Sequence, residues 1–299
     1  MPNSQLKWVY LILLSIIWGS SFILIKKSLV GLNPLQLGAS RILMTAAVLF
    51  VVGFNSLKKI KKHEWKWVVL SGFLGTFFPA FLFAYAETEI DSAIASILNS
   101  SVPLLALIIG FFVFSRSLIK KQVIGVLIGL SGSIALILIG ANVNPDQNYW
   151  YALLPILASL FYATNVNIIK AKMQNIPAMS IALGNFIALI IPAITILWYT
   201  DFFNGSFLSS EQTQISLGYL ALLAVFGTAA AKVMFNKLVQ ISDPVFSSSV
   251  TYLMPIVSVG WGLLDNEKFT AWQFLAALVI LVGVFLVNNN KDKQQEKQE

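Results

Sequence analysis

The chain consists of long apolar runs, each about as long as a membrane helix, separated by short polar connections. A helix needs about 20 mainly apolar residues to cross a bilayer. The runs that meet this length are 8–26, 35–54, 67–86, 93–114, 121–140, 150–169, 179–199, 216–237, 245–264 and 271–288. The pattern therefore predicts an all-α polytopic membrane protein with ten transmembrane helices.

Several residues of the first half of the chain recur in the second half at a nearly constant separation along the sequence. Pro103 and Pro255 are 152 residues apart, and the same offset relates the glycine-threonine pair at Gly75 to the pair at Gly227. The recurrence predicts two five-helix repeats, 8–140 and 141–288, preceded by a cytoplasmic segment 1–7. Because five is odd, the second repeat enters the membrane from the opposite face. Inverted repeats of this kind are typical of secondary transporters, whose sites lie near the midplane between the repeats.

The two repeated prolines lie inside hydroxyl-rich apolar runs. A proline within a helix removes a backbone hydrogen bond and bends the helix, and a membrane tolerates this only where another group satisfies the freed carbonyl. We therefore expect Pro103 and Pro255 to act as hinges or kinks, without predicting a complete break.

Composition and charge narrow the class further. The chain is 57% hydrophobic and 11% charged, against about 25% charged residues in soluble proteins. Fifteen of the 20 lysines and arginines fall on the side that carries both termini, and three fall on the other. This places both termini in the cytoplasm and explains the net charge of +7 without nucleic acid. Residues 289–299 are expected to be a disordered cytoplasmic tail, and the other loop charges are expected to be solvated.

Several short motifs resemble one known family. They are Trp18-Gly19-Ser20-Ser21-Phe22 followed by Lys26, Arg41-Ile42-Leu43, the two prolines, and the segment from Glu267 to Gly283. Together they resemble the EamA-type branch of the drug/metabolite transporter superfamily over residues 8–288. The resemblance implies a solute carrier, often an exporter, with a central cavity lined by helices one, three, four, six, eight and nine. One departure is Ser115, which stands where the first repeat often carries an acid.

Two charged residues, Arg41 and Lys232, lie inside the predicted spans rather than at their ends. Ionisable groups in a bilayer are costly and are candidates for function, so both are candidates for binding a substrate carboxylate or phosphate. The alternative is that these long side chains extend to the membrane surface, or that Arg41 pairs with Glu87 or Glu89.

Other polar and aromatic residues complete the candidate site. Tyr162 and Asn165 share a helix face by their spacing of three, as do Trp18 and Ser21, while Asn99 and Thr251 occupy equivalent repeat positions. Packing and helix–helix hydrogen bonds are the alternative for each. The predicted substrate-binding residues are Trp18, Ser21, Arg41, Asn99, Tyr162, Asn165, Lys232, Thr251 and Tyr252.

These observations predict a secondary transporter that exports small organic metabolites, such as amino acids, by alternating access. A multidrug or lipid-intermediate carrier is the main alternative, and an intramembrane lipid-modifying enzyme or a structural scaffold is a weaker one. No cofactor or metal site is expected, because the chain has no cysteine, one histidine and no phosphate-binding loop. With no acid inside a span, a uniporter or exchanger fits at least as well as a proton antiporter.

The expected partners are a small-molecule substrate and the lipid bilayer of the cell (inner) membrane. The GxxxG pair Gly125 and Gly129 allows close helix packing. We expect this pair to contact helix ten rather than a second copy, so the protein is predicted to be a monomer or a weak homodimer.

Overall fold

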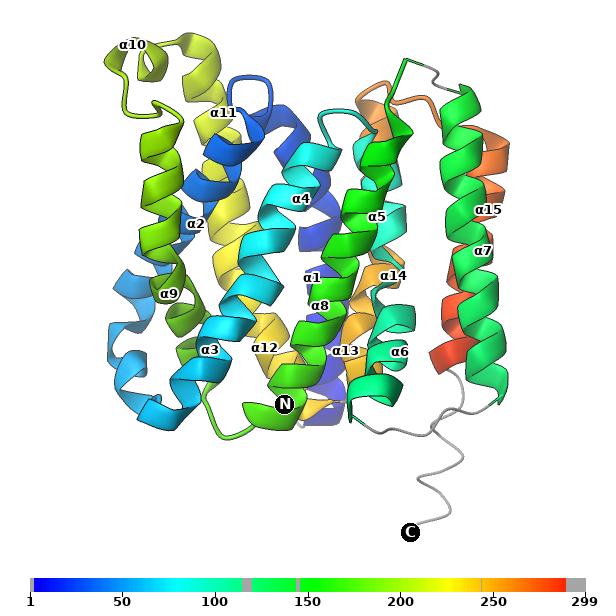
Figure 1. Ribbon diagram of the computed structural model, residues 1–299, viewed down its shortest axis with the longest axis horizontal. Helices are drawn as coiled ribbons and strands as arrows, with labels where there is room; N and C mark the ends of the chain where they lie inside the picture. Colours follow the sequence, from blue (N-terminus) through cyan, green and yellow to red (C-terminus); the bar gives the residue numbers. More distant parts are fainter. Residues whose placement is uncertain (1–2, 115–119, 144–145, 243, 289–299) are drawn as a thin grey trace.

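The computed structural model describes residues 3–114, 120–143, 146–242 and 244–288. Within these residues the regular secondary structure is helical, and turns and loops connect the helices. Long helices run side by side from one end of the molecule to the other (Figure 1). In chain order the elements are α1 Asn3–Ser28, α2 Pro34–Gly53, η1 Phe54–Lys59, η2 Lys62–Glu64, α3 Trp65–Gly72, η3 Phe73–Phe77, α4 Phe78–Ala86, α5 Ser92–Asn99, α6 Val102–Phe114, α7 Lys120–Val143, η4 Tyr149–Ala152, α8 Leu153–Lys172, α9 Ala178–Tyr199, α10 Gly205–Leu208, α11 Glu211–Leu222, η5 Leu223–Ala230, α12 Ala231–Ile241, α13 Pro244–Ser248, α14 Val250–Leu264 and α15 Ala271–Asn288.

Eight helical segments of the described chain are long and apolar enough to cross a membrane. The chain is therefore a multi-pass membrane protein. The two remaining predicted spans fall on α7 and α15, whose described apolar parts, Val123–Ile139 and Ala271–Gly283, are shorter. Ten spans, their repeat relationship and their orientation therefore stay predictions. The predicted tail 289–299 and Ser115 lie outside the described residues.

Helices α7 and α15 lie side by side at one edge of the bundle (Figure 1). A β-carbon added to Gly283 would lie 2.6 Å from the carbonyl oxygen of Gly125 and would also overlap Gly129. Only glycine permits so close an approach of two backbones. The expected packing of the GxxxG pair against the last helix is confirmed.

Two of the long helices contain a stretch of π-helix, which is rare in proteins. The first, η3, joins α3 to α4 and contains Gly75, and the second, η5, joins α11 to α12 and contains Gly227. These glycines are the pair related by the offset of 152 residues. The two π-helical stretches thus occur at corresponding places in the two halves of the chain. Hydrophobic periodicity did not predict this feature.

Two other predicted helices are interrupted. The first breaks at Ser100, between α5 and α6, and the second breaks at Ser249, between α13 and α14. Pro103 follows the first break closely, as a hinge residue would, whereas Pro255 lies inside α14, six residues beyond the second. The interruption of this helix lies at Ser249, and a kink at Pro255 stays a prediction.

A hydrogen bond joins the two interrupted helices at the carbonyl that Pro255 leaves without its helical donor. Pro255 cannot donate to the carbonyl of Thr251, four residues earlier. The hydroxyl of Ser100 donates to that carbonyl instead, at 2.8 Å. The polar cost of the proline is thereby offset within the membrane, and α14 continues through it.

The start of α1 and the end of α15 lie at the same end of the molecule, at the bottom of Figure 1. We call the opposite end, where α1 and α4 end and α5 begins, the upper end. The sequence predicts that the upper end faces the outside of the cell.

Candidate substrate cavity

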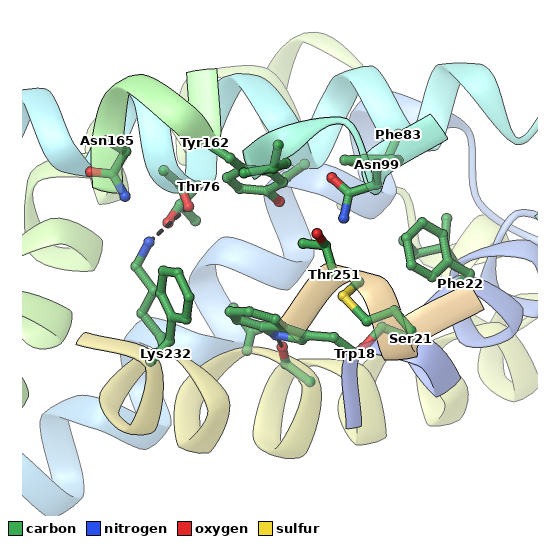
Figure 2. A pocket seen from close by; sticks show the side chains of 18 of the residues that line it. Trp18, Ser21, Phe22, Thr76, Phe83, Asn99, Tyr162, Asn165, Lys232 and Thr251 are labelled. Carbon is green, nitrogen blue, oxygen red and sulfur yellow. Dashed lines mark hydrogen bonds between the residues drawn. The ribbon is translucent and has the colours of Figure 1, made fainter. Parts of the chain in front are cut away.

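A cavity lies in the middle of the bundle and is lined by both halves of the chain. Its lining includes eight of the nine predicted substrate-binding residues: Trp18, Ser21, Arg41, Asn99, Tyr162, Asn165, Lys232 and Thr251. The ninth, Tyr252, is partly buried against the hydrophobic core and is not part of the lining. Figure 2 shows Lys232 and Asn165 toward one end of the cavity, and Asn99 and Phe22 toward the other.

The two cationic residues both point into the protein. Lys232 has an exposed fraction of 6%, and its ammonium group donates to the carbonyl of Gly75 at 2.7 Å. The Nε of Arg41 donates to the hydroxyl of Thr228 at 2.8 Å. Extension to the membrane surface, the sequence-based alternative for both residues, does not describe their positions. Arg41 also forms no ion pair with Glu87 or Glu89 among the described residues.

Both π-helical stretches present a backbone carbonyl to a cavity side chain. The carbonyl of Gly75 accepts from Lys232, and the carbonyl of Gly227 accepts from the indole of Trp18 at 2.9 Å. A π turn disturbs the regular hydrogen-bond ladder, and here side chains from other helices reach the carbonyls. The repeated glycine-threonine pairs were the sequence signal for these two contacts, although their chemistry was not foreseen.

Two buried polar atoms in the lining have no hydrogen-bond partner within the described residues. They are the hydroxyl oxygen of Thr76 and the amide oxygen of Asn165. Buried polar groups are normally satisfied, so these two atoms are available to a bound solute. Asp and Glu are absent from the described lining, so its two basic side chains, Arg41 and Lys232, have no acid beside them there.

The rest of the lining is largely apolar and aromatic. The rings of Phe22 and Phe83 have centroids 5.5 Å apart, Phe83 stacks on Tyr162 at 6.2 Å, and Trp18 lies 4.9 Å from Phe235. The three phenylalanines were not among the predicted site residues, because an apolar residue in a membrane helix carries no distinguishing signal. The cavity volume is about 100 Å³, below the roughly 300–1,000 Å³ of small-molecule sites. It must widen to hold an organic solute.

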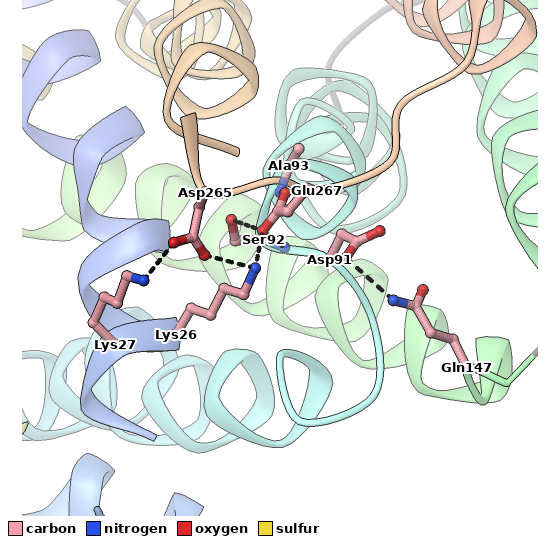
Figure 3. A network of polar contacts seen from close by, with 8 residues as sticks. All are labelled: Lys26, Lys27, Asp91, Ser92, Ala93, Gln147, Asp265 and Glu267. Atoms are coloured by element: carbon pink, nitrogen blue, oxygen red, sulfur yellow. Dashed lines mark hydrogen bonds and ion pairs between the residues drawn. The ribbon is translucent and has the colours of Figure 1, made fainter. Parts of the chain in front are cut away.

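A network of charged groups lies at the upper end, and we call it the upper ion network (Figure 3). Lys26, at the end of α1, contacts Asp265 and Glu267 at 2.9 Å each, and Lys27 contacts Asp265. The carboxylate of Glu267 also accepts from the backbone and hydroxyl of Ser92 at 3.1 and 2.6 Å, and from the backbone of Ala93 at 3.2 Å. The network ties α1 and the start of α5 to the α14–α15 connection.

The carboxyl groups around this network differ in their surroundings. Burial raises the pKa of Asp265, but hydrogen bonds from Lys27 and Lys26 outweigh it and hold that pKa below its usual range. Burial, together with the negative charge of Glu267, raises the pKa of Asp91, which accepts a hydrogen bond from Gln147 at 3.1 Å. The expectation that the loop charges are solvated was therefore wrong for Glu267, whose exposed fraction is 8%.

Comparison with known proteins agrees with this architecture. The sequence model of the EamA-like transporter family matches residues 6–138 and again residues 149–289. The chain belongs to the EamA-like transporter family. Membership confirms the resemblance drawn from the sequence motifs, and it makes this protein a membrane transporter.

Individual relatives of this family member cover nearly the whole chain. It is 26% identical over 289 residues to a probable amino-acid metabolite efflux pump of Salmonella typhimurium, covering 92% of each chain. It is 27% identical to a probable amino-acid metabolite efflux pump of Escherichia coli K12, and the match covers 93% of each chain. It is 26% identical to an uncharacterized inner membrane transporter of the same strain, and that match covers 93% of this chain and 89% of the relative. A crystal structure with 17% identity superposes with a TM-score of 0.64 over 95% of this chain and 96% of that one, which shows a shared fold.

Proposed function

We propose that this protein exports small organic metabolites, such as amino acids, by alternating access around the cavity between its two halves. The observation that carries the proposal is the cavity itself, which is lined by both halves and holds two cations and two unpartnered polar atoms. The proposal includes ten transmembrane helices in two inverted five-helix repeats, with both termini in the cytoplasm and the chain in the cell (inner) membrane. Two relatives named probable amino-acid metabolite efflux pumps support export.

The chemistry of the cavity favours a solute with a carboxylate. Lys232 and Arg41 supply positive charge, and ionised pairs form stronger hydrogen bonds than neutral ones. The amide oxygen of Asn165 accepts a hydrogen bond, as the ammonium group of an amino acid requires. The aromatic lining suits an apolar side chain. A zwitterion or small anion with an apolar part meets all three features.

Alternating access requires the cavity to open at one end at a time. In this structure the upper ion network joins α1, α5 and the α14–α15 connection, and we infer that these bonds hold the upper end closed. Release at that end requires the bonds of Lys26 and Ser92 to Glu267 to break. The interrupted helices contact each other between Ser100 and Thr251, which gives the two halves a point about which to move.

The proposal is tested by measuring the melting temperature of the purified protein with amino acids, nucleosides, sugar phosphates and cationic drugs. A solute that binds only the folded state at about 100 times its Kd stabilises it by about 2.7 kcal/mol. We expect amino acids or small carboxylates to stabilise the wild type but not Lys232→Ala. Lys237→Ala removes an exposed lysine from α12 and should respond like the wild type.

A multidrug or lipid-intermediate carrier is the alternative, and the aromatic lining is the observation that favours it. Bulky cations would then stabilise the wild type and Lys232→Ala equally, and amino acids would have no effect. The two basic side chains at the cavity disfavour the binding of a cation, which makes a carrier of cationic drugs the less favourable alternative.

A second measurement distinguishes transport from binding alone. An amino acid that stabilises the protein is tested for counterflow in proteoliposomes.

A further inference from the structure

Glu87 is a buried acid with few hydrogen-bond donors around it in the described part of the chain. It directly follows α4 at the upper end, and its exposed fraction is 7%. Neither carboxyl oxygen accepts a hydrogen bond of good geometry among the described residues, although the backbone N–H of Lys26 lies close enough to interact with the group. Burying a charged group without a partner is costly enough that the group usually takes up a proton instead. The sequence-based expectation that this loop acid is solvated was wrong.

Comparison with Glu267 shows how unusual this environment is. The two acids are equally buried, at 7% and 8%. Glu267 is bound by one lysine, one hydroxyl and two backbone N–H groups, a set of donors that stabilises a carboxylate. Glu87 has no lysine or hydroxyl donor within the described chain, and the backbone N–H of Lys26 is the donor beside its carboxyl group. The surroundings of Glu87 therefore favour its neutral form in this structure.

Glu87 lies between the cavity and the upper ion network. Its backbone N–H donates to the carbonyl of Phe83 at 2.9 Å, so it lies one helical turn beyond a residue of the cavity lining. On α1, the neighbouring residues Ile25 and Lys26 belong to the cavity lining and to the upper ion network, respectively. Opening the upper end would bring outside water to Glu87 before it reached the cavity.

The charged groups that act on Glu87 come from three other elements. They are Glu267 of the α14–α15 connection, Lys26 of α1 and Arg41 of α2. Burial and then the negative charge of Glu267 raise the pKa of Glu87 well above its usual range, against the attraction of the two cations. Arg41 also lines the cavity, so the acid is electrostatically connected to both the network and the cavity.

We propose that Glu87 is a proton-binding site that couples transport to a proton gradient, an inference that rests on the proposed export function. When the upper end opens, the carboxylate of Glu87 takes one proton from the outer solution. Neutral Glu87 allows the upper end to close over it. When the cavity opens on the other side, water reaches the acid past Arg41, and the same oxygen releases the proton inward. One proton enters per cycle, and no electrons are exchanged.

The first experiment needs no substrate. The melting temperatures of the wild type, Glu87→Gln and Glu89→Gln are measured in detergent between about pH 5 and pH 8. Gln is neutral at every pH and nearly isosteric with a protonated Glu. Because the folded state raises the pKa of Glu87, the contribution of this acid to stability is highest at low pH and is lost as pH rises through that pKa.

The matched control decides whether the effect belongs to this acid. Relative to Glu87→Gln, we expect the melting temperature of the wild type to fall by about 3 °C or more over the range. Glu89→Gln removes a neighbouring acid and should follow the wild type. Parallel curves for the wild type and Glu87→Gln would overturn the proposal, as would loss of folding at low pH in Glu87→Gln, because a neutral group fits the site in our account.

The second experiment measures coupling. Proteoliposomes are loaded with a radiolabelled mixture of amino acids and diluted into acidic or neutral buffer. We expect acidic buffer to accelerate efflux several-fold for the wild type and Glu89→Gln, and to have no effect on Glu87→Gln, which should still exchange amino acids at equal pH. An unchanged gradient response in Glu87→Gln refutes the coupling role. If the wild type moves no amino acid, the proposed substrate class fails, and the melting curves still decide whether Glu87 binds a proton.

Discussion

Removing the charge of Glu267 should open the upper end of the cavity. In Glu267→Gln, the site keeps its shape but loses the carboxylate that binds Lys26, Ser92 and the backbone of Ala93. The amide NH₂ would face donors instead of accepting from them. The resulting variant favours conformations in which α1 and α5 separate from the α14–α15 connection.

The magnitude follows from the contacts that are lost. A hydrogen bond to a charged group contributes about 1.5–3 kcal/mol. The Lys26 side chain is 32% exposed, so its share is discounted for screening by water. We take about 2 kcal/mol for the loss as a whole, because the Gln retains one acceptor oxygen. Since about 1.4 kcal/mol corresponds to a factor of ten, the ratio of closed to open states should fall about 30-fold.

The absence of natural cysteine makes this change measurable. The chain has no cysteine, so Ser21→Cys introduces a single thiol in the cavity lining. A membrane-impermeant maleimide added to intact cells should label it up to about 30-fold faster when Glu267→Gln is also present. Glu211→Gln, which removes an exposed acid from the predicted outer side, is the control and should not change the rate.

Two results would refute this reasoning. Equal labelling rates with and without Glu267→Gln would show that the upper ion network does not hold the cavity closed. Faster labelling only in inside-out vesicles would show that the upper end faces the cytoplasm, contrary to the orientation predicted from the lysines and arginines.

Three further predictions concern stability. Ser100→Ala leaves the carbonyl of Thr251 without its donor and should cost about 1–3 kcal/mol, seen as a lower melting temperature, whereas an unchanged value would mean that water replaces the hydroxyl. Gly283→Leu overpacks the α7–α15 contact and should cost at least about 1–3 kcal/mol, while stabilisation by substrate persists because neither helix lines the cavity. Hydrogen bonds from Lys26 and Lys27 lower the pKa of Asp265. The contribution of Asp265 to stability is therefore present above about pH 4 and is lost as pH falls through its folded-state pKa. In Asp265→Asn, the melting temperature should fall less steeply as the buffer is made acidic.

The membrane class and most of the polar cavity residues were predictable because they depend on local features of the sequence. The length of an apolar run decides whether it can cross a bilayer. A polar residue within such a run must find a polar environment, and in this protein the cavity between the halves is that environment. Trp18, Arg41, Asn165 and Lys232 line it for this reason. Tyr252, one residue from the cavity residue Thr251, shows that helix phase still had to be read from the structure.

Other features were decided by contacts between distant segments. Helix α14 continues through Pro255, where Ser100 of another helix satisfies the carbonyl that the proline frees, and the interruption lies at Ser249. The sequence places Glu87 and Glu267 at the ends of apolar runs, where acids are ordinarily solvated. Only the tertiary structure buries both acids, places four donors around Glu267 and, within the described residues, places no side-chain donor beside Glu87. The residues that bury a side chain and bind it by hydrogen bonds come from elements far along the chain. Burial and hydrogen bonding therefore cannot be predicted from neighbouring residues, whereas the hydrophobicity of a segment can.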